Sequence, residues 1–478
     1  MQLPNIKDAR IRTKEKIEVS YDKYKVPESI HNIGHNKTYT ILTYGCQMNV
    51  HDSENISGIM EDLGYTKEEN YEKADVIIIN TCAIRENAQN KVVGILGRIK
   101  KLKETNPNII TIIGGCMPQE ESVSNMIKDK YKWVDIVLGT HNIYDIPILL
   151  ENITKERKQN IEVYSVEGSI IENLPVKRDS KIKAWVNIQY GCDKFCSYCI
   201  VPYTRGKQRS RLPKDILKEV EELKNKGYKE VTLLGQNVNA YGKDLEESYT
   251  MANLLEDVAK TGIDRIRFVT SHPWDFSSDM IDIIAKYPNI MPYIHLPIQS
   301  GSDNILKKMN RRYTIAEYKK LFHELKDKIP KVSITTDIIV GFPGETDDDF
   351  RELEEFVEKT KFDKLGTFMY SKEEGTPAAR LPEQIHGNTK KSRYNKIMSI
   401  QQKVSNENLK NKIGKNVEVL IEDISFDGKY LIGRTSQDVP EEDGIIYVEN
   451  NNFESKVNSF VNVKVTEVKE YDLIGKIV

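Results

Sequence analysis

The amino-acid sequence predicts an α/β protein with an N-terminal parallel α/β domain, a central six-unit (βα) partial barrel and a small C-terminal β-barrel. Three observations predict this class. Apolar runs rich in isoleucine and valine alternate with amphipathic helical segments over most of the chain. The six cysteines fall into two sets of three, close to the ends of such runs. After position 411 the helical periodicity gives way to short strands separated by turns.

Composition limits the class of protein. The 478 residues are 39% hydrophobic and 30% charged, which is typical of a globular chain with sizeable cores. No apolar run reaches the roughly 18 residues that a membrane span needs. The N-terminus lacks the apolar core of a signal peptide, which favours the cytoplasm, where thiols stay reduced. The net charge of −2 gives no global argument for a nucleic-acid partner, so local patches must carry any such interaction.

Domain boundaries are predicted from changes in composition along the chain. The polar residues 1–36 are expected to form a poorly ordered or loosely packed extension. Residues 37–155 are predicted to form the N-terminal domain, and the charged segment 142–181 reads as a linker. Residues 178–408 are predicted to form the central domain, and residues 411–478 the C-terminal barrel.

Each of the first three predicted strands ends at a cysteine. The strands cover 39–45, 74–81 and 108–115, a helix is predicted over 87–104, and the cysteines are Cys46, Cys82 and Cys116. They are 36 and 34 residues apart, each about the length of one strand–helix–strand unit. A lone cysteine after a strand is usually a packing residue. Because the carboxyl ends of parallel strands meet at one sheet edge, three repeats of this placement instead favour a cluster held by three thiolates.

Six further apolar runs predict the six βα units of the central domain. These runs cover 184–188, 230–234, 265–270, 293–298, 333–340 and 364–370. Helices are predicted over 214–226 and 346–359, with Thr346 as a cap. Chemistry in such folds belongs at the carboxyl ends of the strands, where turns bearing glycine, serine and glutamine follow.

A long polar helix over 392–412 is predicted to precede five short strands. The strands cover 417–421, 430–435, 444–448, 460–468 and 473–478. From residue 411 onward, the sequence contains thirteen Asp and Glu residues but only eight Lys and Arg residues. Binding to a nucleic acid needs cations at the contact, so only a local subset such as Lys412 and Arg434 could serve. A barrel that mainly positions the other domains remains the alternative.

The second cysteine set, Cys192, Cys196 and Cys199, has C-x3-C-x2-C spacing in a loop after the run 184–188. Three thiolates so close together can hold three corners of an iron–sulfur cube and leave one iron open. A structural zinc site needs a fourth ligand, yet no cysteine follows this set and no histidine occurs between His141 and His272. Disulfides would leave one cysteine unpaired. Iron–sulfur binding is therefore the favoured interpretation.

The cysteine loop resembles the signature of radical S-adenosylmethionine (SAM) enzymes, with Tyr198 before the last cysteine. The longer string from Tyr190 to Gly206 is similar to that of the methylthiotransferases. The resemblance implies two 4Fe-4S clusters, one for SAM cleavage and one, on the first cysteine set, for sulfur donation. It further implies SAM contacts by Tyr198, Gly235, Gln236, Asn237, Gln299 and Ser300, and it implies that the C-terminal barrel is similar to the RNA-binding TRAM domain.

Two segments, 44–49 and 370–379, look like the branch that acts on N(6)-isopentenyladenosine in tRNA. For this branch the resemblance implies methylthiolation of carbon 2 of the base 3′ of the anticodon, with two SAM molecules and a sulfur donor. The same chemistry on threonylcarbamoyl-adenosine or on a ribosomal-protein aspartate is one alternative. A non-catalytic RNA-binding protein with zinc is the alternative from another class.

The expected partners follow from these interpretations. A basic string beside the cysteine loop is a candidate phosphate track, with Tyr203 interleaved. Its members are Arg205, Lys207, Arg209 and Arg211. We expect a tRNA anticodon loop as substrate, a flavodoxin or ferredoxin as the low-potential reductant, no membrane, and a monomeric protein.

Overall fold

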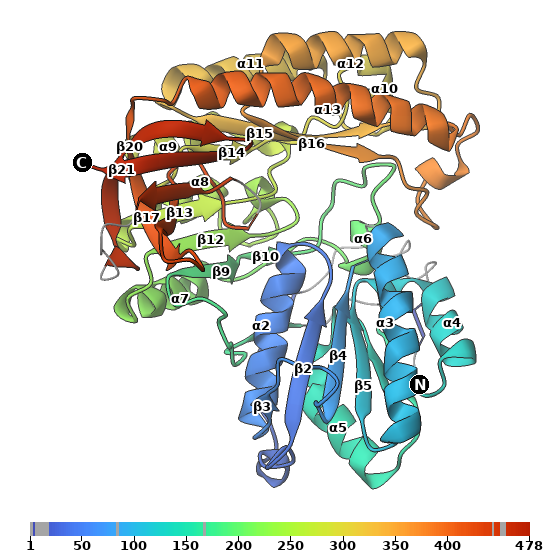
Figure 1. Cartoon of the computed structure of the whole chain (residues 1–478). Coiled ribbons are helices and arrows are strands. Elements are labelled where there is room, and N and C mark those ends of the chain that lie inside the picture. The colour runs from blue at the N-terminus through green and yellow to red at the C-terminus, as the bar shows by residue number, and fades with distance from the viewer. Residues whose placement is uncertain (1–2, 5–18, 83–85, 166–168, 442–443, 450–455) are drawn as a thin grey trace.

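The computed structural model describes residues 3–4, 19–82, 86–165, 169–441, 444–449 and 456–478. Figure 1 shows an N-terminal sheet with its helices in blue to cyan, below a central α/β part in green to orange. The red C-terminal strands pack against the central part at its left side in this view. The predicted α/β class with a small β-barrel at the C-terminus is confirmed.

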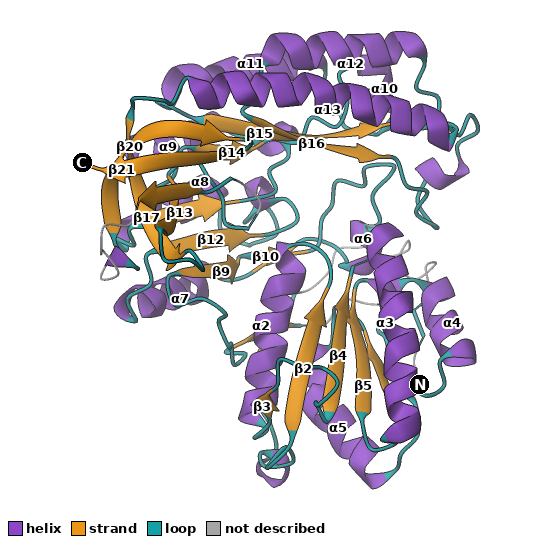
Figure 2. Ribbon diagram, viewed as in Figure 1, coloured by secondary structure: helices purple, strands orange, loops and turns teal. Residues whose placement is uncertain are grey.

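The N-terminal domain contains a parallel sheet in the order β3-β2-β4-β5-β6-β7. Its strands are β2 (Thr38–Thr43), β3 (Thr66–Lys67), β4 (Val76–Thr81), β5 (Ile110–Gly115), β6 (Ile136–Leu138) and β7 (Asn160–Glu162). Its helices are α2 (Gln47–Asp62), α3 (Glu86–Thr105), α4 (Glu121–Lys130) and α5 (Ile146–Lys155). Figure 2 shows these helices flanking the sheet.

Both faces of this sheet are buried, which explains the continuous apolar runs of its central strands. Ile78 and Ile112 enter one core with α2 and α5, whereas Ile77, Ile79 and Ile113 enter a second core with α3 and α4. Alternate residues of a strand point to opposite faces, so a strand covered on both sides must be apolar at every position. The strands predicted over 39–45, 74–81 and 108–115 are confirmed to within two residues at most ends.

The segment 142–181 is not a simple linker, because α5 and β7 both belong to the N-terminal domain. β7 is too short to show a periodicity, whereas Ile146, Leu149, Leu150 and Ile153 of α5 have the i, i+3, i+4, i+7 spacing of an amphipathic helix, a signal that the linker interpretation overlooked. The expectation of a loosely packed N-terminus is also wrong for residues 19–36. There β1 (Tyr21–Lys23) pairs in parallel with β8 (Ile170–Glu172), and the Tyr21 hydroxyl donates to the Ser210 carbonyl at 2.9 Å. Residues 1–2 and 5–18 of the predicted extension lie outside the described residues.

The central domain is a partial barrel of six parallel strands in two halves, β13-β12-β9 and β14-β15-β16. The strands are β9 (Lys183–Asn187), β12 (Glu230–Leu234), β13 (Arg265–Phe268), β14 (Tyr293–His295), β15 (Ser333–Val340) and β16 (Lys364–Met369). A bridge between Ile266 and Ile290 links the halves. The six predicted units are therefore confirmed.

Helices follow the barrel strands, and a short hairpin frames the cysteine loop. The helices are α6 (Val201–Thr204), α7 (Pro213–Asn225), α8 (Met251–Lys260), α9 (Ser278–Lys286), α10 (Asp303–Lys308), α11 (Ile315–Lys328), α12 (Asp347–Thr360) and α13 (Gly387–Lys410). The hairpin pairs β10 (Gln189–Tyr190) with β11 (Arg209–Ser210) in antiparallel register. Thr346 caps α12 with a capping box, as predicted.

The C-terminal strands close into a barrel in the order β17-β18-β19-β21-β20. They are β17 (Asn416–Ile424), β18 (Tyr430–Thr435), β19 (Ile446–Glu449), β20 (Phe460–Lys469) and β21 (Asp472–Ile477). All five predicted strands are present. Their inward residues, such as Val419, Leu431 and Val463, form a separate small core.

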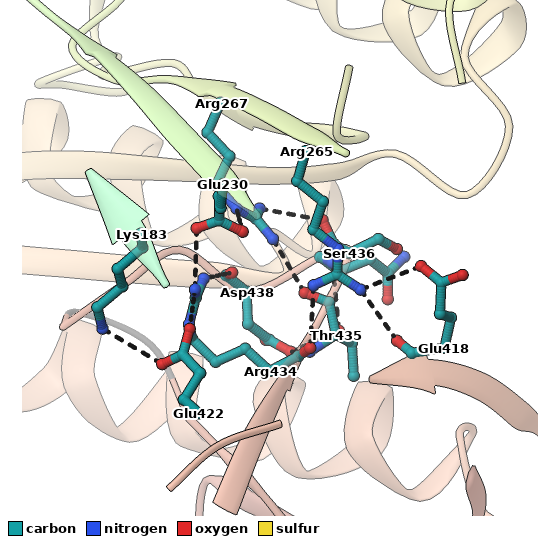
Figure 3. A network of polar contacts seen from close by, with 11 residues as sticks. Lys183, Glu230, Arg265, Arg267, Glu418, Glu422, Arg434, Thr435, Ser436 and Asp438 are labelled. Carbon is teal, nitrogen blue, oxygen red and sulfur yellow. Dashed lines mark hydrogen bonds and ion pairs between the residues drawn. The ribbon is translucent and has the colours of Figure 1, made fainter. Parts of the chain in front are cut away.

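A buried network of charges joins the C-terminal barrel to the amino ends of the central strands (Figure 3). The Glu230 carboxylate, with no exposed surface, accepts from Arg267 at 3.0 Å and from Arg434 at 2.9 Å. Arg267 also donates to the carbonyl oxygens of Thr435 and Ser436. Arg434, which the sequence suggested as a cation for RNA binding, is thus buried and paired with carboxylates inside the protein.

We expect E230Q to destabilise the joint between the two barrels by about 3–5 kcal/mol, because Arg267 would lose the buried carboxylate that it pairs with and Arg434 would keep only Glu422. Burial opposes ionisation of Glu230, but the charges of Arg267 and Arg434 outweigh it and lower its pKa to about 2. The carboxylate therefore stabilises the fold above its unfolded pKa of about 4.3, and this contribution is lost as pH falls towards 2. Urea unfolding of both proteins from pH 7 to pH 3 measures the difference.

The control is E256Q, which removes an exposed carboxylate paired with Lys286 at 2.8 Å. Exposed pairs contribute little, so this variant should unfold with the wild type. An E230Q protein as stable as E256Q at pH 7 would contradict the structural role assigned to Glu230.

Candidate functional site

The first cysteine set lies at the carboxyl edge of the N-terminal sheet. Cys46 follows β2 and caps α2, Cys82 follows β4, and Cys116 follows β5. Cys82 and Cys116 are buried. The Cys46 thiol hydrogen-bonds with that of Cys82 and interacts electrostatically with that of Cys116, so the structure brings the three predicted side chains together.

Two asparagines and one glycine hold the strand ends in place. Asn49 donates from Nδ2 to the carbonyl oxygens of Tyr44 at 3.0 Å and of Thr81 at 2.8 Å, just before two of the cysteines. Asn80 donates to the Asn49 carbonyl at 2.8 Å. Gly45 has φ of +133°, and a Cβ there would lie 2.6 Å from the Cβ of Cys82. Close approach of the two strands therefore requires glycine.

The second cysteine set lies in the loop between β10 and α6. The thiols of Cys192, Cys196 and Cys199 interact electrostatically with one another. Gly191 has φ of +71°, and a Cβ at that position would meet the Lys207 carbonyl oxygen at 2.0 Å. The Cys192 amide donates to the Gly206 carbonyl oxygen at 3.1 Å, which closes the loop at its base.

Groups after α10 fix the far side of this loop. The Ser197 amide donates to the Met309 carbonyl oxygen at 3.0 Å, and Asn310 donates to the Phe195 carbonyl oxygen at 2.9 Å. Arg311, only 4% exposed, lies 3.5 Å from the Cys196 sulfur and donates to the Pro297 carbonyl oxygen at 2.6 Å. Nothing in the sequence indicated this contact.

The ionisation of the thiols depends on their surroundings. The hydrogen bond with Cys82 and the charge of Arg205 lower the pKa of Cys46 to about 6, despite burial. Burial raises the pKa of Cys192 to about 12 and also raises the pKa of Cys116 and Cys199. Because thiolates are the ligands of iron, most of these groups would lose their protons on binding it.

The two cysteine sets approach each other where the N-terminal domain meets the barrel. Cys116 packs against Ile200, the residue directly after Cys199 in the chain. Cys46 contributes to the wall of a cavity of about 660 Å³, together with Thr270 and Gln299 at the carboxyl ends of barrel strands. Thr270 and Gln299 have φ of 72° and 73°, a strained conformation for non-glycine residues that clusters at functional sites.

Buried polar atoms without a partner gather at the same end of the barrel. They belong to Asn187, Gln189, Gln236, Asn237, Asn239 and Ser271, which follow or end β9, β12 and β13. Such groups are rare in folded proteins and costly, so a polar ligand that satisfies them is expected. The predicted SAM contacts Gln236 and Asn237 are among them. Gly235 packs on Gln189, Ser300 is buried, and Tyr198 packs among Met309, Phe342 and Tyr370.

Asp275, which sequence reasoning missed, connects the cysteine loop to the turn after β12. Its fully buried carboxylate accepts from Lys194 at 2.7 Å, from Lys243 at 2.6 Å and from Asn237 at 2.6 Å. Lys194 lies between Cys192 and Cys196 in the chain. The only signal in the sequence was a polar turn after the third barrel strand.

The donor groups fit iron–sulfur clusters. With six cysteines in the chain and two sets of three, each set leaves a four-iron cube one thiolate short. Within the described residues, no three His, Cys, Asp or Glu side chains are grouped so as to hold a single metal ion. A cube meets each thiolate at a different iron, so its ligands do not converge on one point.

The four predicted RNA-binding residues do not form an open track. Arg205, Arg209 and Arg211 are between 5% and 9% exposed. Arg211 pairs with Glu172 and Glu219, each at 2.7 Å, and Arg209 stacks on Tyr190. Lys207 is half-buried. RNA binding by these residues stays a prediction.

Family models match three parts of the chain. They are those of the Radical SAM superfamily over residues 186–357, the Uncharacterized protein family UPF0004 over 38–139 and the TRAM domain over 413–478. A tRNA-2-methylthio-N(6)-dimethylallyladenosine synthase of Oceanobacillus iheyensis is 48% identical over 482 residues, covering 100% of this chain and 91% of that protein. The chain belongs to the tRNA-2-methylthio-N(6)-dimethylallyladenosine synthase family.

Other comparisons agree with membership of this synthase family. The similarly named protein of Staphylococcus saprophyticus is 47% identical over 477 residues, covering 99% of this chain and 91% of its own. The structure of a radical SAM methyltransferase, TsrM, of Kitasatospora setae, with cobalamin and a 4Fe-4S cluster bound, matches with a TM-score of 0.53. That match has 13% identity and covers 71% of this chain and 73% of that one, so it shows a shared fold. The predicted family and branch are confirmed.

We expect the anaerobically reconstituted synthase-family protein to bind about eight irons per chain, four for each cysteine set. C82A and C196A should each retain about four, because each removes a ligand from only one set. Iron and sulfide analysis with absorption spectra measures this. Stoichiometric zinc without iron, or the loss of all iron in either single variant, would contradict two separate clusters.

Proposed function

We propose that this protein is a tRNA-2-methylthio-N(6)-dimethylallyladenosine synthase, a radical SAM enzyme with 4Fe-4S clusters. The observation that carries this function is 48% identity to a relative of that name over the whole chain. The tRNA is accordingly a substrate, and the TRAM match at residues 413–478 agrees with a protein that acts on RNA. None of the described helices has the length and apolar content needed to cross a bilayer.

The cysteine loop is the part that we assign to SAM. Cys192, Cys196 and Cys199 would hold one cluster, and Gly235, Gln236 and Asn237 would face the cofactor from the turn after β12. When bound, a reduced cluster and SAM supply a radical that can remove hydrogen from an unreactive C–H bond. Asp275 orients the site, because it ties Lys194 of the loop to Asn237 of that turn.

Gln299 and Ser300, from the other half of the barrel, complete the proposed SAM site together with Tyr198 of the cysteine loop. Arg311 supports them, since it approaches both the Cys196 sulfur and the Tyr198 hydroxyl at 3.5 Å. Gln299 lines the 660 Å³ cavity that also reaches Cys46. This cavity would place a substrate base between Cys46 and the barrel strand end that carries Gln299.

We assign the first cysteine set to sulfur donation. Cys46, Cys82 and Cys116 would hold the second cluster, and Asn49 keeps the strand ends beneath it together. The packing of Cys116 on Ile200 sets this site beside the SAM loop. Two neighbouring three-thiol sites supply the two different tasks, hydrogen removal and sulfur delivery.

The proposal also specifies the target nucleoside, the electron donor, the cellular location and the oligomeric state. The target is the isopentenyladenosine 3′ of the anticodon, modified at carbon 2 of its ring with two SAM molecules and a sulfur donor. A flavodoxin or ferredoxin would supply electrons, because SAM cleavage needs a low-potential reductant. We place the protein in the cytoplasm as a monomer.

Deletion of the gene should remove the 2-methylthio group from tRNA and leave isopentenyladenosine behind, because the earlier modification does not need this enzyme. Mass spectrometry of nucleosides from total tRNA measures both species. Plasmid-borne wild type should restore the methylthio nucleoside, whereas C196A should not. Unchanged methylthio-isopentenyladenosine in the deletion strain would refute the assigned substrate.

We expect C196A to abolish reductive cleavage of SAM, since it removes a ligand of the cluster assigned to that step. C82A should retain cleavage but form no methylthio product, because it disrupts only the sulfur-donating site. The measurement is 5′-deoxyadenosine and modified nucleoside from the same anaerobic reaction. Equal loss of cleavage in both variants would contradict the division of labour.

A further inference from the structure

Arg205 extends from the barrel into the N-terminal domain. Its backbone ends α6, with its amide donating to the Val201 carbonyl oxygen at 2.8 Å. Its guanidinium donates to the Asn49 side-chain oxygen at 3.0 Å and to the Asp52 carboxylate at 2.7 Å. The residue is 5% exposed, so no solvent competes with these contacts. Sequence reasoning placed this cation on an RNA-binding surface.

The guanidinium lies against the first cysteine set. Its charge acts on both Cys46 and Cys116, and it hydrogen-bonds with Cys116. Its effect on Cys116 is larger than the opposing effect of Asp52. Arg205 thus contacts the thiol of Cys116 directly, whereas Asp52 acts on this thiol only through its charge.

Arg205 also acts on the strand ends through Asn49. The same asparagine that accepts from Arg205 donates to the carbonyl oxygens of Tyr44 and Thr81. Tyr44 lies two residues before Cys46, and Thr81 directly precedes Cys82. A second bond across the boundary lies next to it, from the Thr140 hydroxyl to the Thr204 carbonyl oxygen at 2.6 Å.

We propose that Arg205 is a positioning residue that completes the first cluster site from the other domain and makes that cluster easier to reduce. Reduction adds one electron to the cluster, and a buried cation stabilises that added negative charge far more than an exposed one would. The structure thus couples the sulfur-donating site to the loop that carries the SAM cluster. This inference rests on the proposed function and goes beyond it by assigning the control of one cluster.

The test uses the full-length chain with C192A, C196A and C199A, so that only the first cluster remains. After anaerobic reconstitution, a redox titration followed by electron paramagnetic resonance gives its midpoint potential. R205Q should lower the potential, so that the ratio of reduced to oxidised cluster at a fixed poise falls about tenfold. R205K keeps the charge and should recover most of that ratio.

D52N tests the direction of the charge effect independently. It removes the negative charge that is paired with the guanidinium, so the midpoint potential should rise, opposite to the change in R205Q. A merely structural role would disturb both variants in the same direction. R211Q is the matched control, because Arg211 is a buried arginine on the same segment as Arg205, but its partners are the carboxylates of Glu172 and Glu219.

Several outcomes overturn the proposal. One is R205Q with a full cluster and an unchanged potential, and another is R205Q and D52N shifting the same way. If R205Q loses iron, retention of iron by both R205K and R211Q supports the positioning role, and equal loss in R211Q overturns it. Failure of the proposed function would appear separately, as wild-type protein that leaves the tRNA nucleoside unchanged.

Discussion

Two parallel sheets meet near their carboxyl ends, and the packing of Cys116 against Ile200 marks the place. The N-terminal sheet brings three thiols to its edge because parallel strands place the residues that follow them side by side, whereas the barrel carries its three thiols in the single loop between β10 and α6. Neither edge alone offers more than three cysteine ligands. The apposition places two incomplete three-thiol sites next to each other, and the cavity lined by Cys46 also reaches Gln299 at the end of a barrel strand.

Several buried arginines of this protein form ion pairs that hold its domains together. Arg205 and Arg211 lie in one short basic run, yet each meets carboxylates contributed by other parts of the chain. Arg267 and Arg434 do the same around Glu230 (Figure 3). A net charge of −2 hides this arrangement, because internal pairs cancel. These arginines therefore have carboxylate partners within the protein, whatever further contacts the run makes.

The sequence alone predicts those helices, strands and loops whose residues share one environment along the whole segment, such as burial on both faces of a sheet. The strand at 76–81 is buried on both faces and is apolar for that reason, and the cysteine spacing is fixed by a local loop. It could not predict partners that are distant in the chain, such as Asp52 for Arg205, 153 residues away. A basic run has the same appearance whether it faces solvent or a buried carboxylate.

Very short elements could not be predicted either, because they show too few residues to reveal a pattern. The strand at 160–162 has one buried residue, Ile161, so it offers no alternation to recognise. Asp275 likewise gives no pattern of its own, because its importance comes from three donors on separate elements.

The side-chain polar atoms of Asn187 and Gln236 are buried and have no hydrogen-bond partner, which indicates a binding site for a polar ligand. Each buried polar group without a hydrogen bond costs about 1–3 kcal/mol. A fold that gathers several of them at one barrel end, beside a loop with three thiols, is more stable with a polar ligand bound. SAM, with its amino, carboxylate and adenine groups, has the donors and acceptors that such a site lacks. The same stabilisation would make SAM binding and the order of this loop depend on each other.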